Sequence, residues 1–393
     1  MAFSLSSQNV PQYLLDSELC TQEDFGNLKI EPKHLKNFNL LVSLRDRQKL
    51  LVKQERRGQN GQTANEFFNE WQFHQLLQKF PELDALTASV SEVVHFDETD
   101  SIMIYKYLVD YEDLEVFYAR QEHLFPTTIA ASIGKILATL HRQTLNREDC
   151  CEFISQTPEG KNRVVFGNPA QPMERIEPEI FGLASPDHLK FFALYQRYNS
   201  LEAEIVKLSN HWQPCCVVHN DLKFNNILLH REWAQHDPTR PISTESVIRL
   251  IDWERCGWGD PICDLASMLS NYLLVWLGSM VVDSSINLEE SLRLARTPLE
   301  MLQPSITTLT QTYLSDFPEI LEHRHDFIER LVQFTGLALL IQVRGRLEYQ
   351  KILGNTGICM LQVAKSLLCR PEQSVFSIFG RSKAELLNLS VAA

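Results

Sequence analysis

The sequence predicts an α+β fold with a small N-terminal lobe, built from an antiparallel sheet and one helix, and a larger, mostly helical C-terminal lobe. Short apolar runs bounded by polar turns cluster before residue 108 and indicate strands. From residue 265 onward the apolar residues recur at helical spacing. With 393 residues and 44% hydrophobic content, the chain can bury a large core. We expect an N-lobe over residues 1–108 and a C-lobe over residues 109–393.

The N-lobe elements follow from local patterns. Residues 39–44 and 48–54 read as two strands around a charged turn, and Lys53 ends the apolar run of the second. Residues 63–79 carry a broad apolar face and read as a helix. Residues 92–96 and 101–108 flank a polar turn, which predicts a hairpin that leads into the connection between the lobes.

The C-lobe pattern is mainly helical. Residues 129–143 have the apolar spacing of a buried helix. An insertion over residues 149–212 mixes turn-forming residues with one apparent helix. The helices expected in the insertion and the C-terminal part are 187–208, 288–302, 305–317 and 326–352.

Polar residues in the middle of the chain carry the chemistry. His219-Asn220-Asp221 is followed by Asn226, and Asp252 ends a second apolar run. The apolar runs 227–229 and 247–251 predict two short strands in a ribbon, which would bring Asn226 and Asp252 together. An amide and a carboxylate suit a hard cation such as Mg²⁺, and Asp221 can accept the proton of an attacking hydroxyl. This set predicts phosphoryl transfer from ATP.

Three motifs in this order resemble the aminoglycoside phosphotransferase and choline kinase branch of the protein-kinase-like superfamily. They are H-x-D-x-x-x-x-N at His219 to Asn226, I-D-W-E at Ile251 to Glu254, and G-D-P-x-x-D-L-A at Gly259 to Ala266. The segment from Ile133 to His141 resembles the family's L-G-x-x-L-A-x-L-H helix. The resemblance implies a protein-kinase-like two-lobe fold that uses ATP and Mg²⁺.

The resemblance also assigns residues to the phosphates. Lys53 stands where the family keeps its phosphate-binding lysine. Glu70 is the expected partner of that lysine, and Glu66, one helical turn earlier, is the second candidate. A solvated helix face is the competing interpretation of either glutamate.

The adenine site follows from the same comparison. Backbone groups of the segment between the lobes would bind the base, which makes Tyr107 and Leu108 its expected neighbours. Leu51, Leu228 and Ile251 occupy apolar positions that would enclose the ring, although each also suits an ordinary core position.

Two features depart from the family pattern. No glycine occurs in residues 31–39, where a phosphate-binding loop is expected, so Lys33 or Lys36 would have to supply point charges instead. Lys223, two residues after Asp221, is a residue type found in protein kinases at this place. It could neutralise the transferred phosphoryl group.

The residues around these motifs have expected supporting roles. We expect Asp264 to support the catalytic loop, Asp260 to cap a turn or helix, and His219 to brace Asp221. Only four residues separate the Asp252 motif from Gly259, which leaves no room for the activation loop of a protein kinase.

Composition limits the partners and the compartment. A formal charge of −13 disfavours nucleic acid or an anionic membrane as a partner, and no signal peptide or membrane-spanning segment is visible. Nine cysteines without metal-binding spacing predict reduced thiols in a cytoplasm. Cys256 and Cys263 are expected to be packing residues.

The sequence therefore predicts an ATP-dependent kinase that phosphorylates a hydroxyl group of a small molecule. A kinase for Ser or Thr in a precursor peptide of lanthipeptide-type biosynthesis, acting with a separate lyase, is one alternative. A non-catalytic nucleotide-binding pseudokinase is another. The oligomeric state stays open, and the acceptor would contact the insertion and the C-terminal helices. Candidate charged residues there are Glu289, Glu290, Arg344, Arg346 and Glu348.

Overall fold

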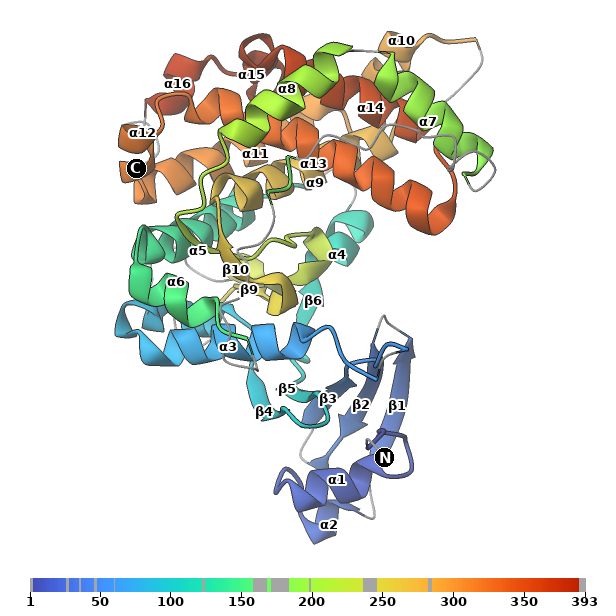
Figure 1. Ribbon diagram of the computed structural model, residues 1–393, viewed down its shortest axis with the longest axis vertical. Helices are drawn as coiled ribbons and strands as arrows, with labels where there is room; N and C mark the ends of the chain where they lie inside the picture. Colours follow the sequence, from blue (N-terminus) through green and yellow to red (C-terminus); the bar gives the residue numbers. More distant parts are fainter. Residues whose placement is uncertain are drawn as a thin grey trace. The chain divides into compact units, whose positions relative to one another are not determined.

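The computed structural model divides the chain into two compact units (Figure 1). The sheet unit comprises Met1–Phe117, Glu148–Arg163 and Asn225–Gly257, and the helical unit comprises Tyr118–Arg147, Val164–Phe224 and Trp258–Ala393. The predicted lobe boundary at residue 108 remains a prediction. The structure describes residues 3–25, 28–34, 37–45, 48–59, 61–121, 124–157, 168–170, 184–197, 199–235, 246–281 and 285–388.

A five-stranded antiparallel sheet forms the centre of the sheet unit, with the strand order β1-β2-β3-β5-β4. The predicted strands and hairpin are confirmed with small shifts of their ends, and β1 adds an edge strand that was not predicted. The bounds are β1 Lys29–His34, β2 Phe38–Ser43, β3 Lys49–Gln54, β4 Val93–Asp97 and β5 Ile102–Lys106.

Alternating side chains of β3 and β5 divide between two apolar clusters. Val52 and Ile104 pack with Val10 and Leu14 of helix α1 (Val10–Asp16) on one face of the sheet. The neighbouring residues of these strands point to the opposite face, where Met103 and Tyr105 pack against Phe67 of helix α3 (Glu66–Lys79). The predicted helix 63–79 is therefore present, and it begins three residues later than expected.

A second, three-stranded sheet in the same unit carries the central motifs. β8 (Ile227–His230) pairs antiparallel with both β6 (Tyr111–Asp113) and β9 (Ile248–Leu250). Ile227 lies opposite Leu250, and the Ile251 N–H donates to the Asn226 carbonyl at 3.0 Å. The predicted ribbon is thus formed, and it brings the backbone of Asn226 next to the residue that precedes Asp252.

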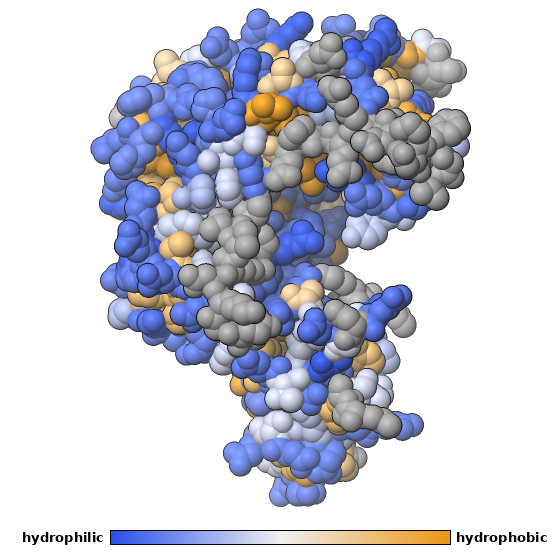
Figure 2. All heavy atoms as spheres, in the orientation of Figure 1, coloured by the Kyte–Doolittle hydropathy of each residue, from blue (hydrophilic) through white to orange (hydrophobic). Residues whose placement is uncertain are grey.

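Packed helices make up most of the helical unit (Figure 1). Long helices α5 and α11 lie against each other, and α13 packs on α9 and α14. Polar side chains cover most of the visible face, with scattered apolar ones among them (Figure 2). The longer helices are α5 Thr127–Thr144, α7 Pro186–Gln196, α8 Asn199–Asn210, α9 Ile262–Gly278, α11 Leu299–Asp316, α13 Phe327–Gln350, α14 Gly354–Cys369 and α15 Pro371–Phe379.

Shorter elements complete the two units. The remaining α-helices are α2 Gln22–Phe25, α4 Leu114–Arg120, α6 Glu148–Ile154, α10 Leu288–Arg293, α12 Glu319–His323 and α16 Lys383–Leu387. The 3₁₀ turns are η2 Pro81–Ser89, η4 Phe224–Asn226, η5 Trp233–Gln235 and η6 Trp253–Arg255, and strands β7 Cys216–Val218 and β10 Gly257–Gly259 form a two-stranded pair. In the described part of the chain, no helix has the length and apolar character needed to cross a bilayer.

Two helix predictions were wrong in their boundaries. The predicted helix 187–208 is two helices, α7 and α8, and the second begins at Asn199-Ser200, residue types that favour helix starts over helix interiors. The predicted break at Pro304 does not occur, because α11 runs through this proline and begins after Pro298. Residues 158–167 and 171–183 of the insertion lie outside the described residues.

Candidate active site

A cavity of about 310 Å³ in the sheet unit brings seven predicted site residues together. These residues are Leu51, Lys53, Tyr107, Leu108, Leu228, Ile251 and Asp252. Leu51, Leu228 and Ile251 are half-buried at this cavity, whereas their neighbours on the strands, such as Val52 and Leu229, are fully buried. The half-buried positions favour the cavity-lining interpretation of these three residues over the core interpretation.

The cavity also has a polar lining that the sequence did not indicate. Ser91, Glu92, Tyr105, Lys106, Tyr111, Glu112, Asp113 and Arg231 contribute to it. These residues come from the flanks of β4 and from β5, β6 and β8, so only the strand pairing identifies them as neighbours. Arg249, which is buried beneath them, pairs with Glu92 at 3.0 Å and donates to the Tyr111 hydroxyl at 3.2 Å.

The chain segment after β5 has a constrained backbone. The Tyr107 N–H donates to the Lys49 carbonyl at 2.8 Å, and the Leu108 carbonyl accepts the Tyr111 N–H at 3.3 Å. Among the described residues, the Leu108 N–H has no hydrogen-bond acceptor. Leu108 therefore presents a donor at the cavity, which agrees with its predicted place beside a base.

Lys53 and Asp252 face each other across this cavity. The Lys53 ammonium lies 3.7 Å from Asp252 Oδ1 and 4.9 Å from the centre of the Tyr105 ring. Both side chains keep some exposure, 17% for Lys53 and 29% for Asp252. The ion pair of Lys53 in this structure is thus with Asp252, and the pairing of Lys53 with Glu70 stays a prediction.

Glu70 is fully buried on α3 behind the cavity. Its Oε1 accepts a hydrogen bond from the Ser91 hydroxyl at 3.4 Å, and its Oε2 has no hydrogen-bond partner among the described residues. Burial raises the pKa of Glu70 from its ordinary value of 4.5 to about 7, although the nearby charge of Lys53 lowers it. Glu66 is half-buried at the start of α3, and its N–H donates to Glu55 Oε1 at 3.2 Å. The burial of Glu70 beside Lys53 favours it over Glu66 as the partner.

The substitution Glu70→Gln should stabilise the protein at pH 8 and have little effect near pH 5. Because the pKa of Glu70 is higher in the folded chain than in the unfolded chain, wild-type stability falls as the pH rises from about 4.5 through about 7. The uncharged glutamine removes this loss, which is on the order of 3 kcal/mol. Thermal unfolding of both proteins between pH 5 and pH 8 measures the effect, and Glu66→Gln is the matched control. Parallel pH profiles for wild type and Glu70→Gln would contradict it.

Asp252 has a strained backbone that is held from behind. Its φ of 68° and ψ of 55° lie in the left-handed region, which costs free energy for a residue with a side chain. Trp253 stacks on Phe73 of α3 with 3.7 Å between ring centroids, and Asn69 donates to the Glu254 carbonyl at 3.1 Å. The stacking explains the tryptophan of the motif, and both contacts hold the turn that carries Asp252.

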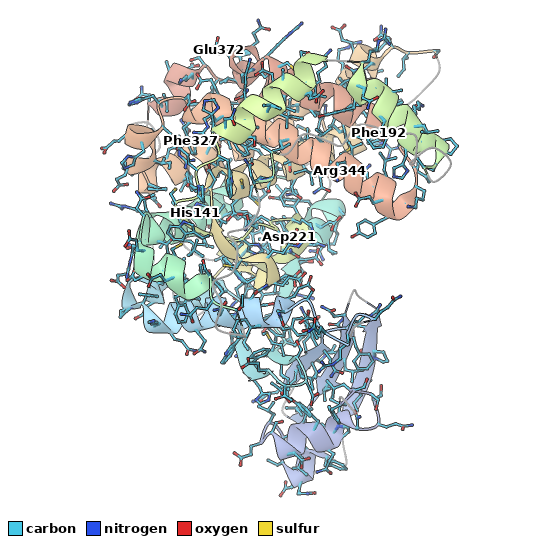
Figure 3. All side chains as sticks on the ribbon, in the orientation of Figure 1. His141, Phe192, Asp221, Phe327, Arg344 and Glu372 are labelled. Atoms are coloured by element: carbon cyan, nitrogen blue, oxygen red, sulfur yellow. The ribbon has the colours of Figure 1, made fainter. Side chains whose placement is uncertain are left out.

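Asp264 supports the catalytic loop in the helical unit. Its carboxylate accepts the N–H groups of His219 at 2.7 Å and Asn220 at 2.9 Å, and His141 Nε2 lies 3.3 Å away. Burial raises the pKa of Asp264, but hydrogen bonding and the charges of the two histidines lower it overall. His141, marked in Figure 3, contacts the Tyr313 hydroxyl at 3.0 Å. The predicted supporting role of Asp264 is confirmed by these bonds.

Asp221 projects from this loop beside two residues that orient it. The Asp221 N–H donates to His219 Nδ1 at 3.3 Å. Lys223 Nζ contacts both carboxylate oxygens, at 2.8 and 2.9 Å. Asn220 adopts a left-handed φ of 63°, a conformation that asparagine tolerates better than most residues. The strained turn and the lysine define where the Asp221 carboxylate points.

The sequence predicted part of the role of Asp260, and the structure explains the glycine at position 259. A Cβ at Gly259 would lie 2.5 Å from Val218 Cγ2, so glycine permits the close pairing of β10 with the strand that leads into the loop. Asp260 accepts the Ile262 N–H at the start of α9, which agrees with its predicted capping role. Its ion pairs with Arg324 and Arg330 were not predicted.

Of the two lysines proposed to supply point charges to the phosphates, the structure describes Lys33. Lys33 is an exposed residue of β1, and Lys36 lies outside the described residues. Arg344, marked in Figure 3, pairs with Glu348 on α13 at 3.7 Å, and both side chains are at least half exposed.

A family model for the "phosphotransferase enzyme family" matches residues 35–287, which is more than half of the chain. The chain belongs to this family. The predicted membership, the α+β fold and the assignment as a phosphotransferase that acts on hydroxyl groups are thereby confirmed. The matched range contains all three motifs, whereas Lys33 and the charged acceptor candidates from Glu289 onward lie outside it.

Solved structures resemble this phosphotransferase at low sequence identity. A choline kinase, LicA, from Streptococcus pneumoniae is 15% identical, with 92% of this chain and 98% of that chain covered and a TM-score of 0.49. A macrolide 2′-phosphotransferase, MphH, from Brachybacterium faecium is also 15% identical, with 93% and 99% covered and a TM-score of 0.45. A choline/ethanolamine kinase family protein from Mesorhizobium loti is 15% identical, with 90% and 93% covered and a TM-score of 0.44. No curated protein sequence matches this phosphotransferase significantly.

Proposed function

We propose that this phosphotransferase transfers the γ-phosphate of ATP to a hydroxyl group of a small molecule. The observation that supports the proposal is the cavity of the sheet unit, which is lined by the residues predicted for the base, by Lys53 for the phosphates and by Asp252 for the metal, whereas Asn226 and Glu70 are not among its lining residues. An apolar lining from Leu51, Leu228 and Ile251 suits a planar base. Lys53 and Asp252 provide the polar end of the same cavity.

The residues present fit a magnesium nucleotide. Asp252 supplies a partly exposed carboxylate, and Asn226 supplies an amide at the end of η4, directly before β8. Mg²⁺ prefers oxygen ligands and commonly takes only one or two from the protein, with phosphates and water completing its shell. When bound, the magnesium nucleotide supplies the phosphoryl group and neutralises charge during transfer. Lys53 is the proposed cation for the phosphates, and Glu70, whose charge interacts with that of Lys53, is the proposed partner of this lysine.

Asp221 is the proposed general base. Its carboxylate is 13% exposed and is oriented by Lys223 and by the loop that Asp264 supports. An aspartate held in this way can accept the proton of an acceptor hydroxyl as the phosphoryl group is transferred. Lys223 then lies beside the site of charge development, where an ammonium stabilises the transferred group.

A panel of acceptors tests the proposal. ATP consumption and phosphorylated product should be measured with choline, an aminoglycoside, a macrolide, simple sugars and Ser- or Thr-containing peptides, each with and without Mg²⁺. Turnover with a small hydroxyl compound supports the proposal. Turnover with peptides alone would favour the precursor-peptide kinase, and ATP binding without turnover on any acceptor would favour the pseudokinase.

A further inference from the structure

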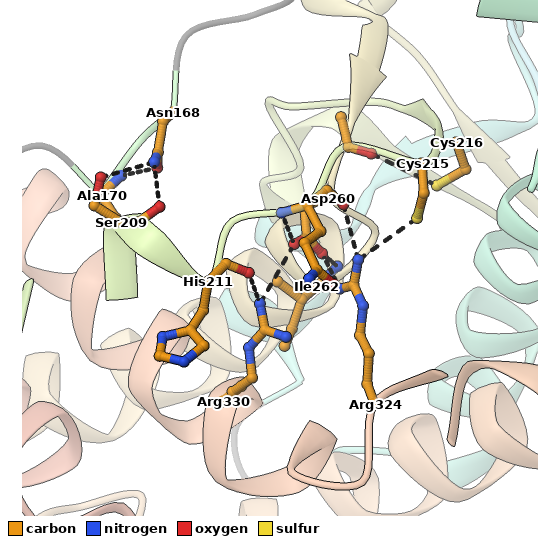
Figure 4. Close-up of polar contacts among 12 residues, drawn as sticks. Asn168, Ala170, Ser209, His211, Cys215, Cys216, Asp260, Ile262, Arg324 and Arg330 are labelled. Carbon is orange, nitrogen blue, oxygen red and sulfur yellow. Dashed lines mark hydrogen bonds and ion pairs between the residues drawn. The ribbon is translucent and has the colours of Figure 1, made fainter. Parts of the chain in front are cut away.

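A buried cluster of charged residues and one thiol lies in the helical unit, apart from the residues of the proposed site (Figure 4). Asp260 pairs with Arg324 and, at 3.8 Å, with Arg330. The exposed side-chain fractions are 0% for Asp260, 3% for Arg324 and 6% for Arg330. Arg324 also donates to the Gln213 carbonyl at 2.8 Å and to Cys215 Sγ at 3.5 Å.

The charges of this cluster do not balance without a second anion. Two guanidinium groups share the one carboxylate of Asp260, and an uncompensated charge is costly where water is excluded. Arg330 Nε is buried and has no hydrogen-bond partner among the described residues. Asp326 also acts on Arg330, but it is exposed, so solvent screens its charge. Besides Asp260, the thiols of Cys215, Cys216 and Cys263 are ionisable neighbours of Arg324. Among these thiols the Cys215 sulfur accepts a hydrogen bond from the guanidinium, so the cluster favours a negative charge there.

The backbone of Cys215 is held on both sides while its side chain faces Arg324. The Cys215 N–H donates to the Gly259 carbonyl at 2.9 Å, and its carbonyl accepts the Asn146 N–H at 2.7 Å. Cys215 is partly exposed, whereas the neighbouring Cys216 is buried. The thiol of Cys215 thus lies beside a cation, on a residue that keeps part of its surface exposed.

We propose that Cys215 is a reversible thiol-modification site that exchanges with low-molecular-mass disulfides. The Cys215 thiolate attacks one sulfur of the disulfide R–S–S–R, a Cys215–S–S–R bond forms, and R–S⁻ leaves with the electron pair of the broken bond. The disulfide is the oxidant, and a thiol reductant reverses the exchange. The inference does not depend on the proposed kinase activity.

The ionisation of the cysteines agrees with this proposal. A hydrogen bond from the Cys216 thiol and the charge of Arg324 lower the pKa of Cys215, although burial opposes them. Burial instead raises the pKa of Cys20, Cys151 and Cys369, which are also partly exposed. These three thiols serve as internal controls in the same protein.

Site-resolved labelling of the wild-type chain tests the inference first. The full-length protein is treated with dithiodipyridine, a small uncharged disulfide, and peptide mass mapping follows each cysteine from about pH 6 to about pH 8.5. Cys215 should react first, and its rate should fall less at low pH than the rates of the three control cysteines. If Cys215 reacts no faster than the controls, or if all four rates fall together with pH, the proposal is wrong.

An arginine substitution tests the cause. Arg324→Gln removes the cation beside the thiol, so the pKa of Cys215 should rise and a smaller fraction of the thiol should be ionised. The labelling rate of Cys215 should then fall about threefold for each unit of this rise, because the remaining thiolate is more nucleophilic and partly offsets the loss. Arg293→Gln, at a position 76% exposed on α10, is the matched control and should leave the rate unchanged. An unchanged rate in folded Arg324→Gln would overturn the role of the cluster. If that variant does not fold, the wild-type pH profiles decide.

Discussion

Replacing Asp221 with asparagine should lower kcat by roughly 10²- to 10⁴-fold, because an amide cannot accept the proton of the acceptor hydroxyl. The change keeps the size of the side chain. It also keeps the backbone bonds that define the loop, since the Asp221 N–H bonds to His219 and Asp264 holds the N–H groups of His219 and Asn220. The apparent affinity for ATP should change little, because the residues proposed for the nucleotide lie elsewhere in the chain.

Steady-state kinetics with an acceptor found in the panel measure this effect. Glu372→Gln replaces an exposed carboxylate on α15, and it is the matched control for loss of one negative charge in the same unit. A kcat for Asp221→Asn within about tenfold of wild type would contradict the role of general base, which is worth more than that in known cases. Thermal unfolding should show that both variants are folded.

The sequence predicted the parts of the fold whose patterns are local. β2, β3, β5 and α3 are continuous runs with a clear period, so apolar spacing places them within a few residues. Helix α1 was missed because its seven residues bury only Val10 and Leu14, too few to show a period. The helix boundaries near Pro304 were misplaced because a single residue type was given more weight than tertiary packing, which allows α11 to continue.

Some residues of the proposed site could likewise be predicted from the sequence, and others could not. The motif residues could be named because their types and spacing are unusual, and the strand register then explains why Leu51, Leu228 and Ile251 meet at one cavity. Tyr105 and Ser91 could not be found, since nothing in the sequence shows that they approach Glu70. The pairing of Asp260 with Arg324 spans 64 residues, and an arginine in a polar segment looks the same whether it is buried or solvated.

Replacing Asp252 with asparagine should abolish most of the Mg²⁺-dependent turnover, with a loss of at least about 10²- to 10³-fold from removal of one preorganised charge. Asparagine is the cleaner choice because the backbone at this position has a φ of 68°, which alanine would adopt at a cost in stability. The Trp253 stacking on Phe73 stays in place, so the fold should be retained. The variant also loses the ion pair with Lys53.

The pattern of kinetic changes separates this variant from Asp221→Asn. Loss of a metal ligand should raise the Mg²⁺ concentration needed for half-maximal rate and weaken binding of the magnesium nucleotide, whereas loss of the base should lower kcat alone. Titration of turnover and of ATP binding with Mg²⁺ measures both effects, with Asp84→Asn at an exposed position of η2 as the control. If turnover of Asp252→Asn saturates at the same Mg²⁺ concentration and the same rate as wild type, the Asp252 carboxylate does not hold the metal. Its main role would then be the ion pair with Lys53.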